Sequence, residues 1–326
     1  MIIDAHRHVI VPEMTARTVP EAWRPALRAA GGRTVVGFRG RDINSVLGEF
    51  TDVAVMLAEA AAAGVDHLLL SPWINLVPVD ADPGEARLVC QVQNDALARL
   101  AAAHPQLSAV GAVPLQDPEL AARELPGLLA AGLAGVEIPS SVAGRYLGDD
   151  VFLPFWEAAA GTGALVFIHP STRGFGVAAL DGYYLWNSVG NPLETAVAAA
   201  HIAVAGVLER FPRLRVLLAH GGGALPVLRG RLRRAYAVRP EAAARTAQGP
   251  DWSLRRFYYD SVTHDAALLA DLVGYAGPEQ ILLGSDQPFD MGTSHCVAEV
   301  RALGLGSGEE LILGGNAGRL LAMADA

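Results

Sequence analysis

Short apolar runs recur along the chain, and each of them ends in a polar residue or a glycine-rich turn. Most are hydrophobic at every position rather than at alternate positions, which is typical of parallel strands buried on both faces. Eight runs are expected to be strands: 1–8, 66–71, 108–113, 134–138, 164–169, 214–220, 256–261 and 280–285.

Segments rich in Ala, Leu, Glu and Arg, with apolar residues at helical spacing, separate these runs. The clearest lie at 52–63, 86–103, 118–130, 192–210 and 264–275. Repeated alternation of strand and helix favours a closed barrel or a doubly wound sheet. No glycine-rich dinucleotide-binding turn follows the first strand, which favours the barrel.

We therefore predict one (β/α)8 (TIM) barrel domain spanning residues 1–326, a normal length for this fold. A long loop insertion, 10–51, is expected after the first strand, and a second excursion, 171–191, after the fifth. Loops of this length in a compact domain are usually functional or mobile.

Composition narrows the possible partners. The chain is 52% hydrophobic, only 18% charged and has a formal net charge of −9, which disfavours binding to a phosphate backbone and hence nucleic acid. No apolar stretch is long enough to span a bilayer, and the first residues do not resemble a secretory signal. With only two cysteines, no disulfide framework is expected and a reducing cytoplasm is the default.

The first expected strand carries a histidine pair. His6 and His8 are two residues apart, so their side chains point to the same face of a strand. Two neighbouring imidazoles suit zinc or a similar ion, although an isolated His-x-His pair is a modest signal. Asp4 either supports the pair by accepting a hydrogen bond from an imidazole, or is a structural residue of the barrel floor.

Three more residues able to bind a metal end later strands: His169, His220 and Asp286. The strand ends of a (β/α)8 barrel meet at its carboxyl-terminal face, where active sites lie. Five such residues from four strands at one rim indicate a metal centre.

These motifs resemble those of the amidohydrolase superfamily, and within it the branch of aminocarboxymuconate-semialdehyde decarboxylase and related aromatic-acid decarboxylases. The resemblance runs nearly end to end. It is carried by His6-x-His8, His169, Asn191-Pro-Leu-Glu194-Thr195, Gly206-Val-Leu-Glu-Arg-Phe-Pro212, His220-Gly-Gly-Gly, Leu225-Pro226 followed by Arg231, Ser285-Asp286-x-Pro288-Phe289 and Gly315-Asn316-Ala317.

The resemblance implies one divalent ion held by His6, His8, His169 and Asp286, with water completing the site. It also implies that His220 does not bind the ion and acts as general acid and base beside that water. Asp286 is predicted to be catalytic as well as a metal ligand. Zinc is the expected ion, with manganese or cobalt as alternatives. Many superfamily hydrolases use two ions bridged by a carbamylated lysine, but every basic residue here is arginine, which excludes that arrangement.

The chemistry of such a centre follows from its groups. A divalent ion with an open position lowers the pKa of its water to roughly 7, and a histidine with a pKa of about 6.5 exchanges protons with it at neutral pH. In the family's decarboxylases the metal-bound water or the ion itself engages the substrate beside its carboxylate, and CO2 is replaced by a proton. In hydrolases of the same fold, hydroxide attacks a carbonyl.

Six residues are expected to contact the substrate: Arg39, Arg41, Trp73, Arg173, Trp186 and Phe289. The family places an arginine from the first insertion against a substrate carboxylate, a geometry that guanidinium supports well, and the sequence does not choose between Arg39 and Arg41. Loops after barrel strands shape the pocket, and the aromatic residues can stack on a flat ring. Solvated or loop-anchoring roles are the alternatives.

The other histidines are expected to be structural, except that His264 and His295 lie nearer the rim and remain open. Cys296 is interpreted as a small apolar residue rather than a nucleophile.

The sequence thus predicts a metal-dependent, non-oxidative decarboxylase that acts on a small aromatic or unsaturated carboxylic acid, and the family resemblance implies a homodimer. A hydrolase or hydratase on the same scaffold is the alternative, and a barrel that has lost its chemistry is a third possibility that the intact ligand set disfavours.

Overall fold

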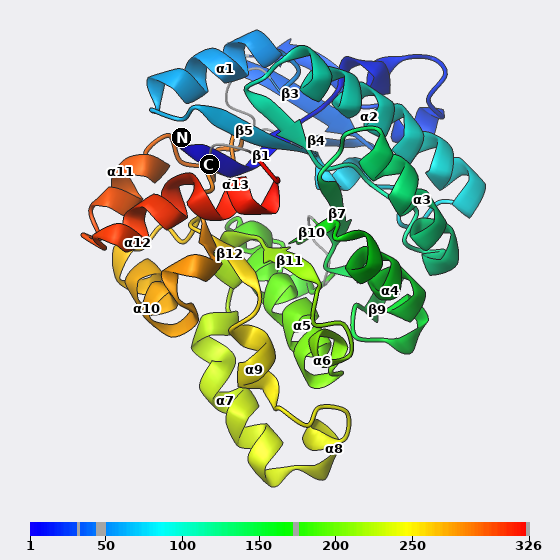
Figure 1. Cartoon of the computed structure of the whole chain (residues 1–326). Coiled ribbons are helices and arrows are strands. Elements are labelled where there is room, and N and C mark those ends of the chain that lie inside the picture. The colour runs from blue at the N-terminus through cyan, green and yellow to red at the C-terminus, as the bar shows by residue number, and fades with distance from the viewer. Residues whose placement is uncertain (31–32, 44–49, 172–175, 324–326) are drawn as a thin grey trace.

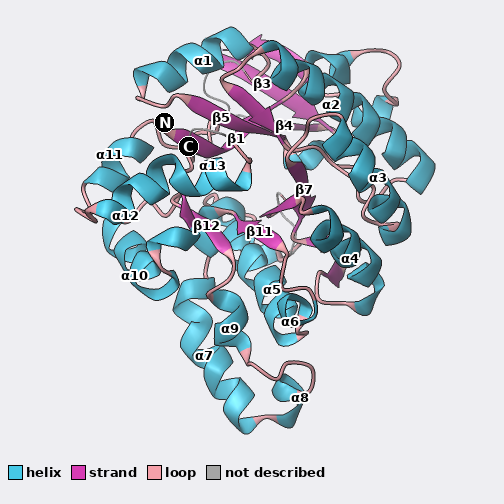
Figure 2. Ribbon diagram, viewed as in Figure 1, coloured by secondary structure: helices cyan, strands magenta, loops and turns pink. Residues whose placement is uncertain are grey.

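A computed structural model of the chain describes residues 1–30, 33–43, 50–171 and 176–323; within these ranges the side chains of residues 30, 33, 34 and 41–43 are not described. Strands occupy the centre of the molecule and helices surround them (Figures 1 and 2).

All eight predicted barrel strands are present, and every pairing between them is parallel. They are β1 (Ile3–Val9), β5 (His67–Pro72), β6 (Leu107–Ala109), β7 (Gly135–Pro139), β10 (Leu165–His169), β11 (Arg215–Leu218), β12 (Tyr258–Asp260) and β13 (Ile281–Leu282). They form two sheets in the orders β1-β5-β6 and β13-β12-β11-β10-β7.

Backbone hydrogen bonds join the two sheets at both edges. At one edge, the Ala5 N–H donates to the Leu283 carbonyl at 2.8 Å and the His8 N–H to the Gln287 carbonyl at 2.8 Å. At the other, the Ala134 N–H donates to the Ala109 carbonyl at 2.8 Å. Isolated parallel bridges lie at both seams. The strands therefore close into the predicted (β/α)8 barrel.

The predicted helices are present as α1 (Val53–Ala62), α2 (Pro83–Ala103), α3 (Pro118–Ala130), α5 (Asn191–Val204) with α6 (Val207–Arg210), and α10 (Ala266–Ala276). Aspartates cap several of them, since Asp52, Asp117 and Asp265 each accept from backbone N–H groups of the first turn. The segment 192–210 was expected to be one helix but is two, because Gly206 adopts a left-handed φ of 70° between them.

Further helices complete the outer layer: α4 (Leu153–Thr162), α7 (Leu225–Val238), α8 (Pro240–Ala243), α9 (Pro250–Leu254), α11 (Cys296–Arg301), α12 (Ser307–Glu310) and α13 (Asn316–Leu320). Within the described ranges, none of the helices combines the length and apolar character needed to cross a membrane.

The insertion after β1 is more ordered than the predicted loop. It contains an antiparallel sheet of β2 (Ala26–Ala30), β3 (Arg33–Phe38) and β4 (Arg41–Ile43), which lies above the barrel in Figure 1. The strands pair with one another rather than with the barrel, so this small sheet is an addition to the fold. The second excursion holds a short π-helix, η6 (Trp186–Gly190).

The barrel interior is a compact apolar cluster distinct from the larger core under the helices. Ile3, Leu165, Phe167, Leu217 and Leu282 belong to it and are at most 1% exposed. Side chains of this size fill the axis below the site, so the barrel is a packed core with its functional groups above it.

A β-bulge in β1 sets which of its side chains face the axis. The register with β5 shifts between Asp4 and Arg7, so one extra residue is inserted there. Ala5 belongs to the interior cluster, and the His6 ring packs 4.8 Å from the ring of Phe167 in that cluster. The consecutive residues Ala5 and His6 therefore both face the barrel interior, and His8, beyond the bulge, places its Nε2 atom 3.0 Å from that of His6.

Candidate metal centre

The four predicted ligands lie together at the carboxyl-terminal end of the barrel. The Nε2 atoms of His6 and His8 are 3.0 Å apart, and each lies within 3.4 Å of Asp286 Oδ1. The His169 ring lies 4.8 Å from that of His8 and 5.3 Å from that of His6. Residues from β1, β10 and the loop after β13 thus converge on one point.

The Nδ1 atoms of all three histidines have a hydrogen-bond partner. The Nδ1 of His6 lies 2.6 Å from Asp260 Oδ2, that of His8 3.0 Å from Ser71 Oγ, and that of His169 2.9 Å from the Pro170 carbonyl. A partner on Nδ1 fixes the orientation of the imidazole and leaves Nε2 available as a metal ligand.

Unsatisfied buried atoms show that the site fits a divalent metal ion. His169 Nε2 and Asp286 Oδ1 are buried and have no hydrogen-bond partner among the described residues. Because such atoms are costly to leave unpaired, a ligand is expected to complete them. Imidazole nitrogens and one carboxylate oxygen are a donor set that zinc and similar ions accept.

Distances alone do not assign every donor. His6, His169, His220 and Asp286 have ligand atoms that all lie within 4.8 Å of one another, and so do His8, Glu137 and His169. His220 is thus as close as the predicted ligands, and its separate acid–base role stays a prediction.

The pKa shifts favour a neutral His169 beside an ionised Asp286, whereas the pKa of His6 is shifted towards the protonated form. Burial, followed by the other histidines, lowers the pKa of His169 well below its usual range. Burial alone raises the pKa of Asp286, but His6, His220 and His8 more than offset it and hold that pKa well below normal. Burial likewise lowers the pKa of His6, and the carboxylates of Asp286 and Asp260 reverse the shift.

Of the two roles left open for Asp4, its contacts among the described residues match the structural one and not that of a partner of an imidazole. Its oxygens accept from Ser285 Oγ at 2.5 Å, the Ser285 N–H at 3.0 Å and the His6 N–H at 3.1 Å, and not from an imidazole. Asp4 therefore ties β1 to the loop that carries Asp286. The partner of a ligating imidazole is instead Asp260, the acidic residue that ends β12.

His220 occupies a strained turn. It has a left-handed φ of 58°, and its N–H and that of Gly221 donate to Asp260 at 2.8 and 2.7 Å. A side chain at Gly223 would collide with the backbone of Pro192, and its φ is 62°. The His-Gly-Gly-Gly motif is thus the local requirement of a turn that aims His220 into the site.

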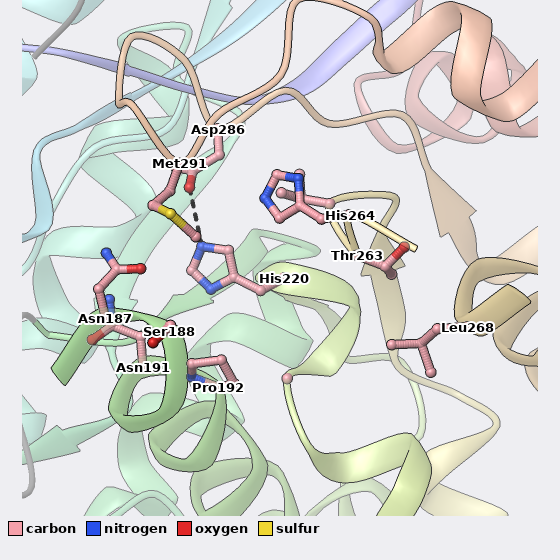
Figure 3. A pocket seen from close by; sticks show the side chains of 12 residues that line it. Asn187, Ser188, Asn191, Pro192, His220, Thr263, His264, Leu268, Asp286 and Met291 are labelled. Atoms are coloured by element: carbon pink, nitrogen blue, oxygen red, sulfur yellow. Dashed lines mark ion pairs between the residues drawn. The ribbon is translucent and has the colours of Figure 1, made fainter. Parts of the chain in front are cut away.

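A pocket of about 210 Å³ opens beside His220 and Asp286. Its volume is below the roughly 300–1,000 Å³ of pockets for drug-sized ligands, which favours a small substrate. Figure 3 shows His220 between two groups of lining side chains and its ion pair with Asp286, in which Nε2 and Oδ2 are 3.3 Å apart. The pocket is lined by Asn187, Ser188, Asn191, Pro192, His220, Gly223, Val262, Thr263, His264, Leu268, Asp286 and Met291.

Of the predicted substrate residues whose side chains the structure describes, none lines this pocket. The Arg39 guanidinium pairs with Asp80 at 2.8 Å and lies 3.9 Å from the centre of the Trp23 ring. Trp73 is buried at 2% exposure against Phe38, so it is a packing residue in this structure. Arg173 and the side chain of Arg41 fall outside the described residues.

Phe289 and Trp186, the other two aromatic residues predicted to contact the substrate, lie closer to the candidate metal centre. The Phe289 ring is 5.1 Å from that of His8, and also 5.2 Å from Phe50 of the first insertion. Trp186 begins the π-helix whose next residues, Asn187 and Ser188, line the pocket. Direct contact of either ring with a substrate stays a prediction.

Sequence reasoning missed Glu137 in β7. It is fully buried, lies 3.8 Å from His8 Nδ1, and neither of its oxygens has a hydrogen-bond partner among the described residues. Burial and the Asp286 carboxylate raise its pKa well above the usual range. A lone acidic residue within an otherwise apolar strand was the available signal.

The structure agrees with the interpretations of His67 as a structural residue and of Cys296 as a small apolar residue. His67 hydrogen-bonds Ser108 at the start of β5, away from the ligands. Cys296 is buried, and burial raises the pKa of its thiol to about 12, so it has no nucleophilic character at neutral pH.

The chain is similar to known proteins over nearly its whole length. The chain is 30% identical over 324 residues to the 2-amino-3-carboxymuconate-6-semialdehyde decarboxylase of Dictyostelium discoideum, covering 97% of this chain and 90% of that protein. It shares its fold with the crystal structure of 5-carboxyvanillate decarboxylase from Sphingomonas paucimobilis (TM-score 0.82, 24% identity, 98% of both chains).

A second similar structure is dihydroxybenzoic acid decarboxylase from Polaromonas sp. JS666 with bound manganese and the inhibitor 2-nitroresorcinol (TM-score 0.78, 24% identity, 100% of this chain and 98% of that chain). Residues 3–322 match the amidohydrolase family. On the strength of that match and of its near full-length relative, the chain belongs to the amidohydrolase family.

Proposed function

We propose that this protein is a metal-dependent, non-oxidative decarboxylase, a carboxy-lyase acting on a small aromatic or unsaturated carboxylic acid. The observation that carries the proposal is the position of His220. Its Nε2 faces Asp286 Oδ2 at 3.3 Å, and its ring lines the pocket beside the ligand set. A proton donor next to a cation site is what replacement of CO2 by a proton requires.

The relatives support this reaction. Curated proteins that match this chain are named as decarboxylases of 2-amino-3-carboxymuconate-6-semialdehyde, 6-methylsalicylic acid and gamma-resorcylate. Their substrates share a carboxylate on an unsaturated or aromatic carbon. That shared chemistry defines the substrate class proposed here.

In the proposed reaction, a carboxylate leaves as CO2 and the carbon that carried it gains a proton. His6, His8, His169 and Asp286 would hold a divalent ion, which would supply positive charge to stabilise the negatively charged substrate. His220 delivers the proton from Nε2, and the adjacent Asp286 carboxylate stabilises the imidazolium before transfer. The apolar side chains of Val262, Leu268 and Met291 form part of the pocket lining and limit water there.

Zinc as the native ion and a homodimeric assembly belong to the same proposal. Three imidazoles and one carboxylate suit zinc, although a related structure was solved with manganese. Metal analysis of protein purified without added metal tests the first point, and sedimentation at several concentrations tests the second.

The experiment for the function is direct. Metal-loaded protein is incubated with a panel of hydroxybenzoates and muconate-type acids, and CO2 release is measured in normal and deuterated water. The expected result is CO2 together with deuterium at the vacated carbon. Hydrolysis of esters or amides with incorporation of labelled solvent oxygen, and no CO2 from any acid, would make the protein a hydrolase instead.

A further inference from the structure

Three residues of the pocket share an unusual backbone conformation. His220, His264 and Asp286 have φ values of 58°, 55° and 56°, in the left-handed region that L-residues with side chains seldom adopt. They follow three successive strands of the barrel wall, β11, β12 and β13, and all three line one pocket. Such conformations carry a cost in backbone strain and cluster at functional sites.

His220 and Asp286 are already explained by the metal centre, whereas His264 is not. His264 is an exposed residue, and its side chain has no hydrogen bond or ion pair among the described residues. In Figure 3, His264 lies on one side of His220, and Asn187 and Asn191 lie on the other. The pocket thus has polar groups on both flanks of the proton donor.

The loop that carries His264 is anchored on both sides. Before it, the Val262 N–H donates to Asp260 Oδ1 at 3.0 Å, and this same carboxylate binds His6. After it, Asp265 caps α10 through the Leu268 N–H at 2.8 Å, and Thr263 Oγ1 donates to the Asp265 carbonyl at 3.0 Å. The backbone around His264 is therefore fixed relative to the metal centre.

We infer that His264 is a specificity-determining residue of this site, whose imidazole hydrogen-bonds a polar substituent of the substrate. The substituent is a ring hydroxyl or a second carboxylate, on the part of the molecule away from the carboxylate that is lost. This inference rests on the proposed function, because the proposed function is what identifies the ligand as an aromatic carboxylic acid. The pocket's small volume and its polar flanks favour a substituted single ring over an extended chain.

The test replaces His264 with asparagine. Asn tolerates left-handed φ better than most residues, so His264→Asn removes the imidazole while keeping the turn. The matched control is His295→Asn, because His295 is also an exposed histidine beyond a barrel strand but is absent from the pocket lining. Metal content and melting temperature of both variants are expected to equal those of the unmodified protein.

Binding is measured first by calorimetry, with metal-loaded protein and three probes: benzoate, 3-hydroxybenzoate and benzene-1,3-dicarboxylate. In His264→Asn, the two substituted probes are expected to bind on the order of 10-fold more weakly, while benzoate changes little, as for the loss of one hydrogen bond. Equal weakening of all three, no weakening, or no binding of any probe to the unmodified protein overturns the inference.

Turnover separates this inference from the proposed function. If the unmodified protein releases CO2 from substituted acids, His264→Asn should raise KM for them more than it lowers kcat, and His295→Asn should do neither. If no acid is decarboxylated but the selective loss of binding is found, the reaction class is wrong and His264 is still a ligand-contacting residue. Loss of metal from His264→Asn would assign it a structural role and overturn the inference.

Discussion

The Oδ2 atom of Asp260 lies 2.6 Å from Nδ1 of His6, and both residues are completely buried. The same carboxylate accepts the backbone N–H groups of His220, Gly221 and Val262. One side chain therefore orients a proposed metal ligand, the turn of the proposed proton donor and the start of the His264 loop.

Asp260→Asn should weaken metal binding roughly 10- to 100-fold, as for other partners of ligating histidines. An amide has a single acceptor oxygen and carries no charge, so it cannot satisfy all four donors. The dissociation constant of zinc, measured by competition with a chelator, tests this. Asp265→Asn is the matched control, since Asn caps a helix as well as Asp and this residue lies away from the ligands. An unchanged zinc affinity in Asp260→Asn would contradict the assigned role.

His169→Ala and His220→Ala should separate metal binding from proton transfer. The first is expected to lose both metal and activity, because it removes a ligand from the centre. The second should retain the metal and lose turnover by a factor on the order of 10² to 10⁴, as for a general acid. Metal content by elemental analysis alongside the rate of CO2 release distinguishes them. Loss of the metal from His220→Ala would make that residue a ligand.

Glu137→Gln should stabilise the metal-free protein at neutral pH. Burial and the Asp286 carboxylate raise the pKa of Glu137, so the folded protein takes up a proton that the unfolded chain releases above a pH of about 4.3. The stability of the unmodified protein therefore falls as the pH rises above that value. The glutamine variant does not lose stability in this way, because its side chain does not ionise. Melting temperatures in chelator should diverge between pH 5 and 8, with the variant higher. A variant that melts lower than the unmodified protein at pH 8 would refute this account.

Glu194, which is not one of the predicted metal ligands, makes a pH-dependent contribution to the stability of the folded protein. It is buried at the start of α5, where Oε1 accepts from Ser141 Oγ at 3.3 Å and Ser171 Oγ at 3.2 Å, while Oε2 has no partner among the described residues. Burial raises its pKa to about 7. The folded state is thus favoured by protonation, and this contribution is lost as pH rises from about 4.3 to about 7.

Glu194→Gln keeps the acceptor for both serines and cannot ionise. Above pH 7, its free energy of unfolding should exceed that of the unmodified protein by about 3 kcal/mol, and the difference should vanish near pH 4.5. Denaturant titrations across this range measure it. Glu157→Gln, on the exposed face of α4, is the control and should show no pH-dependent difference. A difference independent of pH would mean that Glu194 does not titrate in this range.

The eight strands were predictable because the signal is local. Parallel strands buried on both faces must be apolar along their length, and the polar residues that end them must lie at one rim once the barrel closes. His6, His8, His169 and Asp286 were found in this way, with the family resemblance adding their roles. The insertion after β1 was expected to be a loop, because its short strands pair only with one another and carry no long apolar run.

Only the tertiary structure decided which residues far apart in the chain contact one another. The sequence offered Asp4 as a possible partner for a histidine, and only folding brought Asp260, 254 positions away, onto His6. The sequence likewise did not distinguish His264 from His295 as a pocket residue, and the loop after β12 places His264 in the pocket lining. Residue type and periodicity are fixed along the chain, whereas a contact depends on how the barrel closes and on a single bulge in β1.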